Sequence, residues 1–341
     1  MAFTIRLRCL RSNSLTRACI LSTLLVTLVC FLWVRLHSSF TYSIPRYSPS
    51  QSTHSSSSPP NPRTWTKTIW QTSKVPVDEL YDEQKERYQT WHALNPEYRH
   101  EVMTDERMAQ YVREKYGGTE VEEAYFEIQD YILLSDLVRY MILFQDGGVY
   151  NDLDVGCMKP INSWVPERFT EAAGVVLGVE VDNKFGPDGR TFDNGEDLFE
   201  LVNWTLVAKP NQPFIRFLIQ RVLDNVKFLA ERQNKSLRNM EVGSVQDVLH
   251  TTGPAAMTNA FFDYAANVTA SQVTHKNFTK ITEPKLVAEV LILPIHAFGA
   301  SHQVQWAGFE PDANSALVHH YFSGSWYSDH VWSLPNKSRS N

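Results

Sequence analysis

The sequence predicts an α/β fold in which helices flank a mostly parallel sheet, preceded by one N-terminal transmembrane helix. After residue 63, short runs rich in β-branched and aromatic residues alternate with longer amphipathic stretches. This alternation is typical of strands and helices that build a parallel sheet. An uncharged apolar run and a segment rich in serine and proline precede residue 63. Neither segment has the composition of strands or helices of such a domain.

The apolar run at residues 18–34 predicts a membrane anchor over residues 18–36. Four arginines precede it, and no acidic residue lies in the first 40 positions. We therefore expect a cytoplasmic tail at residues 1–17 and a lumenal remainder, as in a type II single-pass protein of the secretory pathway. A cleaved signal peptide is the alternative, but Trp33-Val34-Arg35-Leu36 does not resemble a small-residue cleavage site.

Residues 37–62 contain ten serines and five prolines and hardly any aliphatic side chains. Such a segment cannot bury enough apolar area to offset its ordering entropy, so it predicts an extended, disordered stem. The globular domain is expected over residues 63–341.

The charge of the chain is unevenly distributed. The first 40 residues hold five arginines, which leaves 27 basic and 38 acidic residues in the remainder, a net of −11. This balance argues against nucleic acid as a partner. An anionic substrate would need a metal ion or a local basic side chain to be held.

The order of elements follows from apolar periodicity and from turn residues. Asn95-Pro96 and Gly117-Gly118 end two amphipathic stretches, and Pro210 with Pro213 marks the start of another. The expected strands are residues 64–71, 98–103, 149–150, 172–181, 201–208 and 287–294. The expected helices are residues 77–94, 105–115, 121–144 and 214–229, with a last helix that a turn at residues 251–254 opens and that runs through Ala265.

Two carboxylates, Asp152 and Asp154, stand where the short strand at residues 149–150 stops. Residues two apart on a strand point to the same face, so both carboxylates can reach one point in space. A like-charged pair is costly to bury unless a cation neutralises it. The pair therefore predicts a hard divalent ion such as Mn²⁺ or Mg²⁺, carrying a substrate diphosphate.

The helix before this strand carries Asp136 and Arg139, which are three residues apart and can pair on one face. Such pairs usually decorate a solvated face, and the spacing alone leaves both interpretations open. The location favours a functional pair, because this helix leads through Gly147-Gly148 to the two carboxylates. A double glycine suits a backbone that turns sharply or approaches a ligand closely.

The tail at residues 317–326 combines adjacent histidines with a Ser-Gly-Ser loop and a tryptophan. Neighbours on a strand cannot both face one ion, so if His320 is a ligand, His319 points away. His320 with Asp154 would make a mixed nitrogen and oxygen site that suits Mn²⁺. An incidental histidine pair is the alternative.

The cysteines and the N-glycosylation sequons both bear on the expected lumenal location. Cys157 is the one cysteine after residue 30, so no disulfide can form within the domain. Five N-x-S/T sequons fit glycosylated surface loops, and they begin at Asn203, Asn234, Asn267, Asn277 and Asn336.

Four segments together resemble a known family: IWQTSK at residues 69–74, SDLVRYMILFQDGGVYNDLD at 135–154, TGP at 252–254 and HYFSGSW at 320–326. They resemble the fungal DxD-containing glycosyltransferases of family 32, which include the initiation-specific alpha-1,6-mannosyltransferase of the Golgi. The resemblance covers residues 63–326. Segments 203–218 and 290–300 resemble that branch more than the branch that mannosylates inositol phosphoceramide.

The resemblance implies a GT-A fold, a Golgi location, GDP-mannose as donor, Mn²⁺ as cofactor and retention of the anomeric configuration. It implies an alpha-1,6 linkage to a mannan or N-glycan core acceptor, and a complex with other Golgi mannosyltransferases is possible in such a family. The catalytic residues it implies are Asp152, Asp154 and Arg139, and the metal ligands are Asp152, Asp154 and His320. The substrate-binding residues it implies are Asp136, Arg139, Gln71, Thr72, Gly253, Ser325 and Trp326.

The chain departs from the family pattern at three positions. Thr68 and Trp70 replace the usual basic residue and histidine of the opening motif, and residue 151 is asparagine. Two other functions stay open: an inositol phosphoceramide mannosyltransferase, and a non-catalytic glycan-binding protein on the same fold. A metal-dependent phosphohydrolase would usually need more carboxylates and histidines around a second ion.

Overall fold

The computed structural model describes residues 64–183, 198–299 and 313–323, all within one compact unit, Ser58–Asn341. The expected cytoplasmic tail, membrane anchor and stem lie outside the described residues, as do Ser325, Trp326 and Asn336. Within the described ranges, no helix is both long and apolar enough to cross a membrane.

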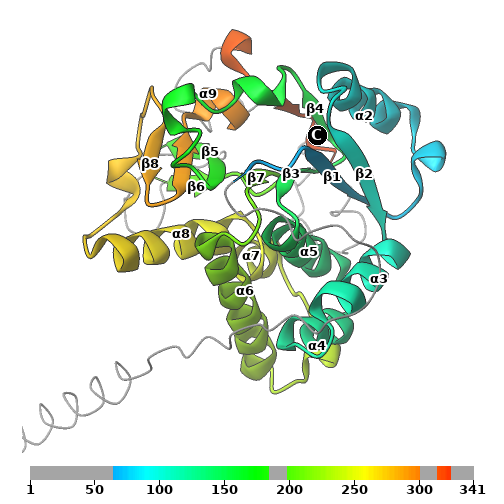
Figure 1. Cartoon of the computed structure of the whole chain (residues 1–341). Coiled ribbons are helices and arrows are strands. Elements are labelled where there is room, and N and C mark those ends of the chain that lie inside the picture. The colour runs from blue at the N-terminus through cyan, green and yellow to red at the C-terminus, as the bar shows by residue number, and fades with distance from the viewer. Residues whose placement is uncertain (1–63, 184–197, 300–312, 324–341) are drawn as a thin grey trace, which may run out of the picture. The chain divides into compact units, whose positions relative to one another are not determined.

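An eight-stranded mixed sheet forms the centre of the described part (Figure 1). Its strand order is β2-β1-β3-β7-β5-β9-β8, and β6 pairs with the second half of β5. Among these strands, β1, β2, β3, β5 and β9 run in one direction, and β6, β7 and β8 run against them. The expected α/β fold is therefore present, with a sheet that is mixed. The strand bounds are β1 Thr68–Ser73, β2 Arg99–Thr104, β3 Gly148–Asn151, β5 Val175–Asn183, β6 Leu198–Leu201, β7 Thr205–Ala208, β8 Lys285–Val287 and β9 Val290–Leu293.

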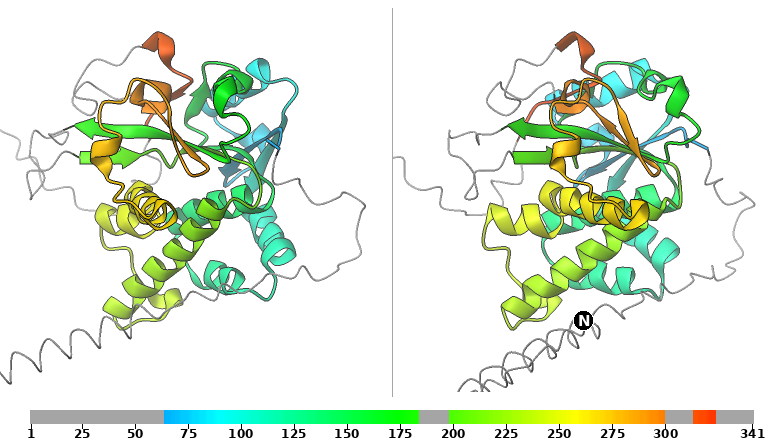
Figure 2. Two further views of the ribbon diagram at one scale, coloured as in Figure 1. Left: turned by 60° about the vertical axis from the view of Figure 1, so that its left-hand side comes forward. Right: turned by 90° about the vertical axis from the view of Figure 1, so that its left-hand side faces the viewer.

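Helices cover both faces of this sheet, and each face has its own apolar core (Figure 2). The larger core lies under α3 Asp105–Tyr116, α4 Glu120–Glu127, α5 Tyr131–Gln145, α6 Pro213–Arg232, α7 Val245–Thr251 and α8 Pro254–Thr269. The smaller core lies under α2 Asp82–Leu94 and α9 Ile295–Phe298. Successive side chains of a strand serve these two cores alternately: Trp70 and Tyr150 face the larger one, and Ile69 and Val149 the smaller one.

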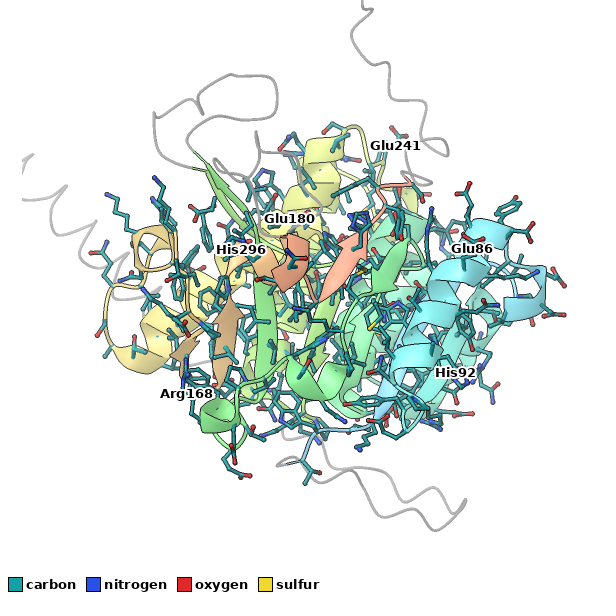
Figure 3. The ribbon with its side chains drawn as sticks, turned by 90° about the horizontal axis from the view of Figure 1, so that it is seen from above. Glu86, His92, Arg168, Glu180, Glu241 and His296 are labelled. Carbon is teal, nitrogen blue, oxygen red and sulfur yellow. The ribbon has the colours of Figure 1, made fainter. Side chains whose placement is uncertain are left out.

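Short 3₁₀ helices join these elements. Seen from above, α2 with Glu86 and His92 lies at one side of the molecule, and the 3₁₀ helix η3 with Arg168 lies at the other (Figure 3). The 3₁₀ helices are η1 Val77–Glu79, η2 Ile161–Ser163, η3 Glu167–Phe169, η4 Leu237–Asn239, η5 His275–Asn277 and η7 Ala313–Ser315.

A second, two-stranded sheet joins the chain after Asp154 to the C-terminal segment. β4 (Val155–Cys157) pairs antiparallel with β10 (Val318–His320), so that His320 lies opposite Val155. The backbone N–H of Tyr321 also donates to the carbonyl of Asp154 at 2.9 Å. These bonds hold the expected tail histidine directly beside the expected carboxylate pair.

Several expected elements are interrupted in the structure. The helix expected at 121–144 is two helices, because Asp130 caps α5 by accepting from the N–H groups of Ile132 and Leu133. The helix expected at 77–94 becomes regular only from Asp82. The strand expected at 201–208 breaks into β6 and β7, and the one expected at 287–294 is the β8–β9 hairpin.

The double glycine between α5 and β3 is needed because the backbone turns into the sheet with almost no room. Gly147 and Gly148 have φ values of 65° and 109°, which L side chains rarely adopt. A Cβ on Gly148 would lie 2.4 Å from the carbonyl oxygen of Thr68 on the neighbouring strand. The carbonyl of Gly147 accepts from the indole N–H of Trp70 at 2.8 Å. Both glycines are therefore required for β3 to reach its place.

We expect Gly148→Ala to lower the free energy of unfolding by about 2–4 kcal/mol, because it combines backbone strain with a steric clash. Urea unfolding followed by circular dichroism would measure this loss. Gly243→Ala is the control, since Gly243 is exposed and a Cβ there meets its nearest atom at 3.4 Å. Equal stability of the two variants would contradict the close approach of β3 to β1.

Candidate active site

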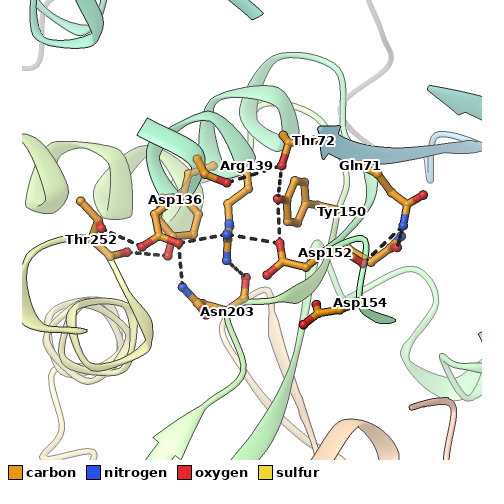
Figure 4. A network of polar contacts seen from close by, with 12 residues as sticks. Gln71, Thr72, Asp136, Arg139, Tyr150, Asp152, Asp154, Asn203 and Thr252 are labelled. Atoms are coloured by element: carbon orange, nitrogen blue, oxygen red, sulfur yellow. Dashed lines mark hydrogen bonds and ion pairs between the residues drawn. The ribbon is translucent and has the colours of Figure 1, made fainter. Parts of the chain in front are cut away.

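Arg139 lies at the centre of a buried polar network at the end of β3 (Figure 4). Its Nη2 is 3.0 Å from Asp136 Oδ1 and 3.3 Å from Asp152 Oδ1. Its Nη1 donates to the carbonyl oxygen of Asn203 at 2.8 Å. The guanidinium also lies 4.9 Å from the centre of the Tyr150 ring. One cation from α5 thus joins two carboxylates that are sixteen residues apart.

Asp136 is held by more than its ion pair. Asn203 Nδ2 donates to Oδ1 at 3.2 Å, and the Thr252 hydroxyl donates to Oδ2 at 2.7 Å. Burial raises the pKa of Asp136 above its ordinary value, although Arg139 and these two hydrogen bonds act to lower it. The Asp136 and Arg139 side chains are each 6% exposed, so the interpretation of this pair as a solvated surface pair is wrong.

Asn203 also corrects the expectation that all five sequons lie in surface loops. Asn203 and Thr205 of this sequon are both buried, and the Asn203 amide is used to donate to Asp136. A glycan on that nitrogen would have no space next to Asp136. Of the other sequons, Asn234, Asn267 and Asn277 are exposed, and Asn336 lies outside the described residues.

Asp152 and Asp154 have different surroundings although they lie two residues apart. Asp152 Oδ1 accepts from the Tyr150 hydroxyl at 2.8 Å and contacts Arg139. Burial raises the pKa of Asp152 to about 6 against the opposing effect of Arg139, and the charge of Asp154 adds to the rise. Burial would also raise the pKa of Asp154, but contacts with His320 and Ser323 more than offset it and lower this pKa. Asp154 is therefore ionised at neutral pH.

The C-terminal segment contributes directly to this carboxylate. His320 Nε2 lies 3.3 Å from Asp154 Oδ1, and the backbone N–H of Ser323 donates to Asp154 Oδ2 at 3.0 Å. The His320 ring stacks on Trp204, with centroids 4.5 Å apart and planes inclined by 12°. His319 packs against Tyr321 instead. The two histidines thus diverge, as the alternation of a strand requires.

The donor atoms near Asp154 fit a divalent cation that a diphosphate would complete. Two carboxylates and one imidazole are ligands that Mn²⁺ accepts, and Asp154 and His320 are already adjacent. In the part of the chain that the structure describes, no group of three or more histidine, cysteine or acidic side chains is placed to hold a metal ion. Asp152, Asp154 and His320 are therefore not assembled as a three-ligand site in this structure, and an ion at Asp154 would take its remaining ligands from substrate oxygens.

Gln71 and Thr72 lie at the carboxyl end of β1, beside β3. Gln71 is fully buried, and its Nε2 donates to Asn151 Oδ1 at 2.6 Å and to the carbonyl of Asp152 at 3.3 Å. Its Oε1 lies 2.8 Å from His100 Nε2. The side chain of Gln71 therefore holds the backbone of Asp152. Contact of either residue with a nucleotide stays a prediction.

Thr72 and Gly253 border the same network. The Thr72 hydroxyl is 3.0 Å from that of Tyr150, and Gly253 caps α8 directly after Thr252. Sequence reasoning missed His100, Tyr150, Asn203 and Thr252 as contributors. The polar group of Tyr150 in the short apolar strand β3 was a usable signal, because a buried polar group requires a partner, whereas Asn203 and Thr252 lie outside the strands.

The chain is similar to known proteins over most of its length. Residues 81–170 match the family described as "Glycosyltransferase sugar-binding region containing DXD motif". A Candida albicans protein named initiation-specific alpha-1,6-mannosyltransferase is 31% identical over 77% of this chain and 72% of its own length. A Schizosaccharomyces pombe protein of the same name is 32% identical over 77% of this chain, and the match spans 64% of that protein.

Similarity to solved structures is weaker. A structure described as PaToxG glycosyltransferase is 14% identical, and the match covers 63% of this chain and 75% of that chain with a TM-score of 0.38.

We expect Arg139→Met to lower the free energy of unfolding by about 3–5 kcal/mol, because it leaves Asp136 buried without its counter-charge. Arg238→Met is the matched control: Arg238 pairs with Glu127 at the surface, where solvent screens the pair and its loss has little effect on stability. Urea unfolding measures both. A loss at Arg139 no larger than at Arg238 would contradict the buried network.

We expect His100 to make the free energy of unfolding depend on pH in the acidic range. Burial, with a smaller effect of His92, lowers the pKa of His100 to about 4. Its Nε2 faces the side-chain amide oxygen of Gln71, and its buried Nδ1 has no hydrogen-bond partner among the described residues, so a second proton would lack an acceptor. The unfolded chain binds that proton near pH 6.5. The free energy of unfolding should therefore decrease as pH falls from about 6.5 to 4.

Replacement of this histidine isolates its effect. His100→Asn should flatten the dependence of the unfolding free energy on pH over this interval, whereas replacement of the exposed His250 should leave it as in the unaltered chain. Unfolding titrations at several pH values measure this. Identical pH profiles for His100→Asn and the unaltered chain would rule out the effect.

Proposed function

This chain belongs to the DXD-containing glycosyltransferase family of the initiation-specific alpha-1,6-mannosyltransferases, and from this premise we propose that it transfers mannose from GDP-mannose to a glycan acceptor. The acceptor is a mannan or an N-glycan core, the new linkage is alpha-1,6, and the configuration at the anomeric carbon is retained. The observation that carries this proposal is the carboxylate pair after β3, in which Asp152 contacts the buried Arg139 and Asp154 contacts His320 of β10.

Asp152, Asp154 and His320 are the residues that would hold Mn²⁺. When bound, this ion supplies a Lewis acid for the diphosphate that leaves as the glycosidic bond breaks. The N–H of Ser323 holds Asp154 Oδ2, and His320 Nε2 lies 3.3 Å from Oδ1. To act as a ligand, His320 would exchange this contact with Asp154 for the ion.

Arg139 and Asp136 stabilise the arrangement of the carboxylate pair. Arg139 keeps a positive charge next to Asp152, which offsets part of the repulsion between the two neighbouring carboxylates. Asp136 in turn fixes the orientation of Arg139, since its own partners Asn203 and Thr252 hold it in place. The mannosyl group is proposed to bind on the Asp152 side of this network.

We propose the Golgi membrane as the location, with the N-terminal anchor in a type II orientation and the domain in the lumen. The apolar run at residues 18–34 and the arginines before it support this placement. The serine- and proline-rich stem would hold the domain away from the membrane. Association with other mannosyltransferases of that compartment belongs to the same proposal.

Replacement of either carboxylate tests the proposed function. In the full-length chain, Asp152→Ala and Asp154→Ala should reduce mannose transfer by about 100-fold or more, because each loses a ligand and a charge opposite the leaving diphosphate. Release of GDP and linkage analysis of the product measure transfer. Asp263→Ala is the control, since Asp263 pairs with Arg221 at the surface of α8.

The same assay separates the alternatives. Full activity of both Asp variants would overturn the assignment. Failure of the unaltered chain to bind GDP-mannose in calorimetry with Mn²⁺ would favour a glycan-binding protein. Transfer to inositol phosphoceramide instead of a mannose oligosaccharide would identify the other branch of the family.

A further inference from the structure

Arg87 on α2 contacts the C-terminal segment that lies against Asp154. Its Nη1 donates to the Ser323 hydroxyl at 2.9 Å, and its guanidinium lies 4.3 Å from the centre of the Tyr321 ring. The Arg87 side chain is 13% exposed, and its Nη2 is 3.2 Å from Glu83, one helical turn earlier. One guanidinium thus contacts two residues of the C-terminal segment, through a hydrogen bond and through a cation–π interaction.

Both residues that Arg87 contacts donate a backbone N–H to Asp154. The N–H of Tyr321 donates to the Asp154 carbonyl at 2.9 Å, and the N–H of Ser323 donates to Asp154 Oδ2 at 3.0 Å. A backbone N–H can orient a carboxylate only if the segment that carries it is itself held in place. The orientation of the Asp154 carboxylate therefore depends on what fixes residues 321–323.

The helix that carries Arg87 is fixed to β4, the strand that follows the carboxylate pair (Figure 1). The indole N–H of Trp91, which is fully buried, donates to the carbonyl of Val155 at 2.8 Å. The Thr90 hydroxyl accepts from the N–H of Cys157 at 2.8 Å. Arg87 lies one turn before Trp91 and therefore on the same face of the helix. Through this face, α2 joins β4 to the C-terminal segment.

We propose that Arg87 is a positioning residue for the donor side of the active site: it holds residues 321–323 where their N–H groups orient Asp154. The inference rests on the proposed function, in which Asp154 binds the ion that carries the donor diphosphate. Arginine suits this role, because its planar guanidinium can donate a hydrogen bond at its edge while its face stacks on an aromatic ring. A lysine ammonium is a point charge and lacks this geometry.

A positive charge near the donor diphosphate is the competing explanation for a functional effect of Arg87. In that case the charge would act through space, and the contact with Ser323 would be incidental. Lysine would then serve as well as arginine, and removal of the Ser323 hydroxyl would change nothing. The two explanations therefore differ in the expected results for Arg87→Lys and Ser323→Ala.

The test uses Arg87→Met, Arg87→Lys, Ser323→Ala and the double variant of Arg87→Met with Ser323→Ala, all in the full-length chain. Arg87→Met keeps the apolar stem and removes the guanidinium. Ser323→Ala removes the hydroxyl and keeps the backbone N–H. Arg221→Met is the matched control, since Arg221 also pairs with a carboxylate, Asp263 at 2.7 Å, and lies 5.6 Å from the Phe217 ring centre. Thermal unfolding shows whether each variant is folded.

Hydrogen exchange of the ligand-free protein is the first measurement, because it requires no donor. Arg87→Met should speed exchange of the Tyr321 and Ser323 amides about three- to tenfold, since the bonds that these amides donate to Asp154 protect them. Arg87→Lys should speed exchange by a smaller factor. Arg221→Met should leave exchange of both amides as in the unaltered chain.

The second measurement compares the Kd for GDP-mannose with Mn²⁺ and the KM for a mannose oligosaccharide acceptor. Arg87→Met should raise the donor Kd about three- to tenfold and leave the acceptor KM unchanged, because Asp154 belongs to the donor side. Ser323→Ala should raise the donor Kd by a smaller factor, since the contact of Arg87 with Tyr321 remains. The double variant should bind the donor as Arg87→Met does, because both changes remove the same hydrogen bond.

Three results would overturn the positioning role while leaving the proposed function intact. The first is unchanged exchange of the Tyr321 and Ser323 amides in Arg87→Met, and the second is an unchanged donor Kd in that variant. The third is a donor Kd of Arg87→Lys equal to that of the unaltered chain, which would assign the effect to charge alone.

Failure of the proposed function has a different signature. An unaltered chain that neither binds GDP-mannose nor transfers mannose would overturn the proposed function and the role of Arg87 in donor binding together. Hydrogen exchange would still show, in that case, whether Arg87 holds the C-terminal segment against Asp154.

Discussion

The guanidinium of Arg139 lies between Asp136 on its own helix and Asp152 at the end of β3, and the arrangement of the site depends on this shared cation. Buried carboxylates without a counter-charge would favour their neutral forms or move toward water. Arg139 cannot lose its proton in a protein, so it is a permanent charge around which acceptors must gather. The Asn203 carbonyl does so as well.

This constraint explains why the surrounding elements have little freedom. Asp136 needs Thr252 and Asn203, which ties the start of α8 and the turn before β7 to α5. Asp152 directly follows β3, so its position depends on how closely β3 approaches β1. That close approach requires a residue without a Cβ at position 148. On the opposite side of the carboxylates, β4 and β10 close the second sheet and bring His320 to Asp154.

The elements of strongest periodicity could be predicted from the sequence, and so could the carboxylate pair. The bounds of α3, α6 and β2 lie within a few residues of expectation. The spacing of Asp136 and Arg139 predicts that they can pair, but spacing cannot tell a solvated face from a buried one, since that depends on what packs against the helix. Asn203 matches a three-residue sequon, and its burial follows from a partner 67 positions away. Gln71 ends the strand expected at residues 64–71, whereas its partners depend on the register between β1 and β3.

The pairing of β10 with β4 has a consequence for how the protein is made. Ser323 donates to Asp154 across 169 positions of sequence, and β10 supplies the imidazole beside that carboxylate. Synthesis proceeds from the N-terminus, so the sheet and its helices can assemble on the ribosome while Asp154 still lacks these two partners. Contacts between such distant segments also form slowly, because a long loop must close first. The last described residues therefore supply contacts to Asp154 that the chain can form only after the strands of the main sheet have been synthesised.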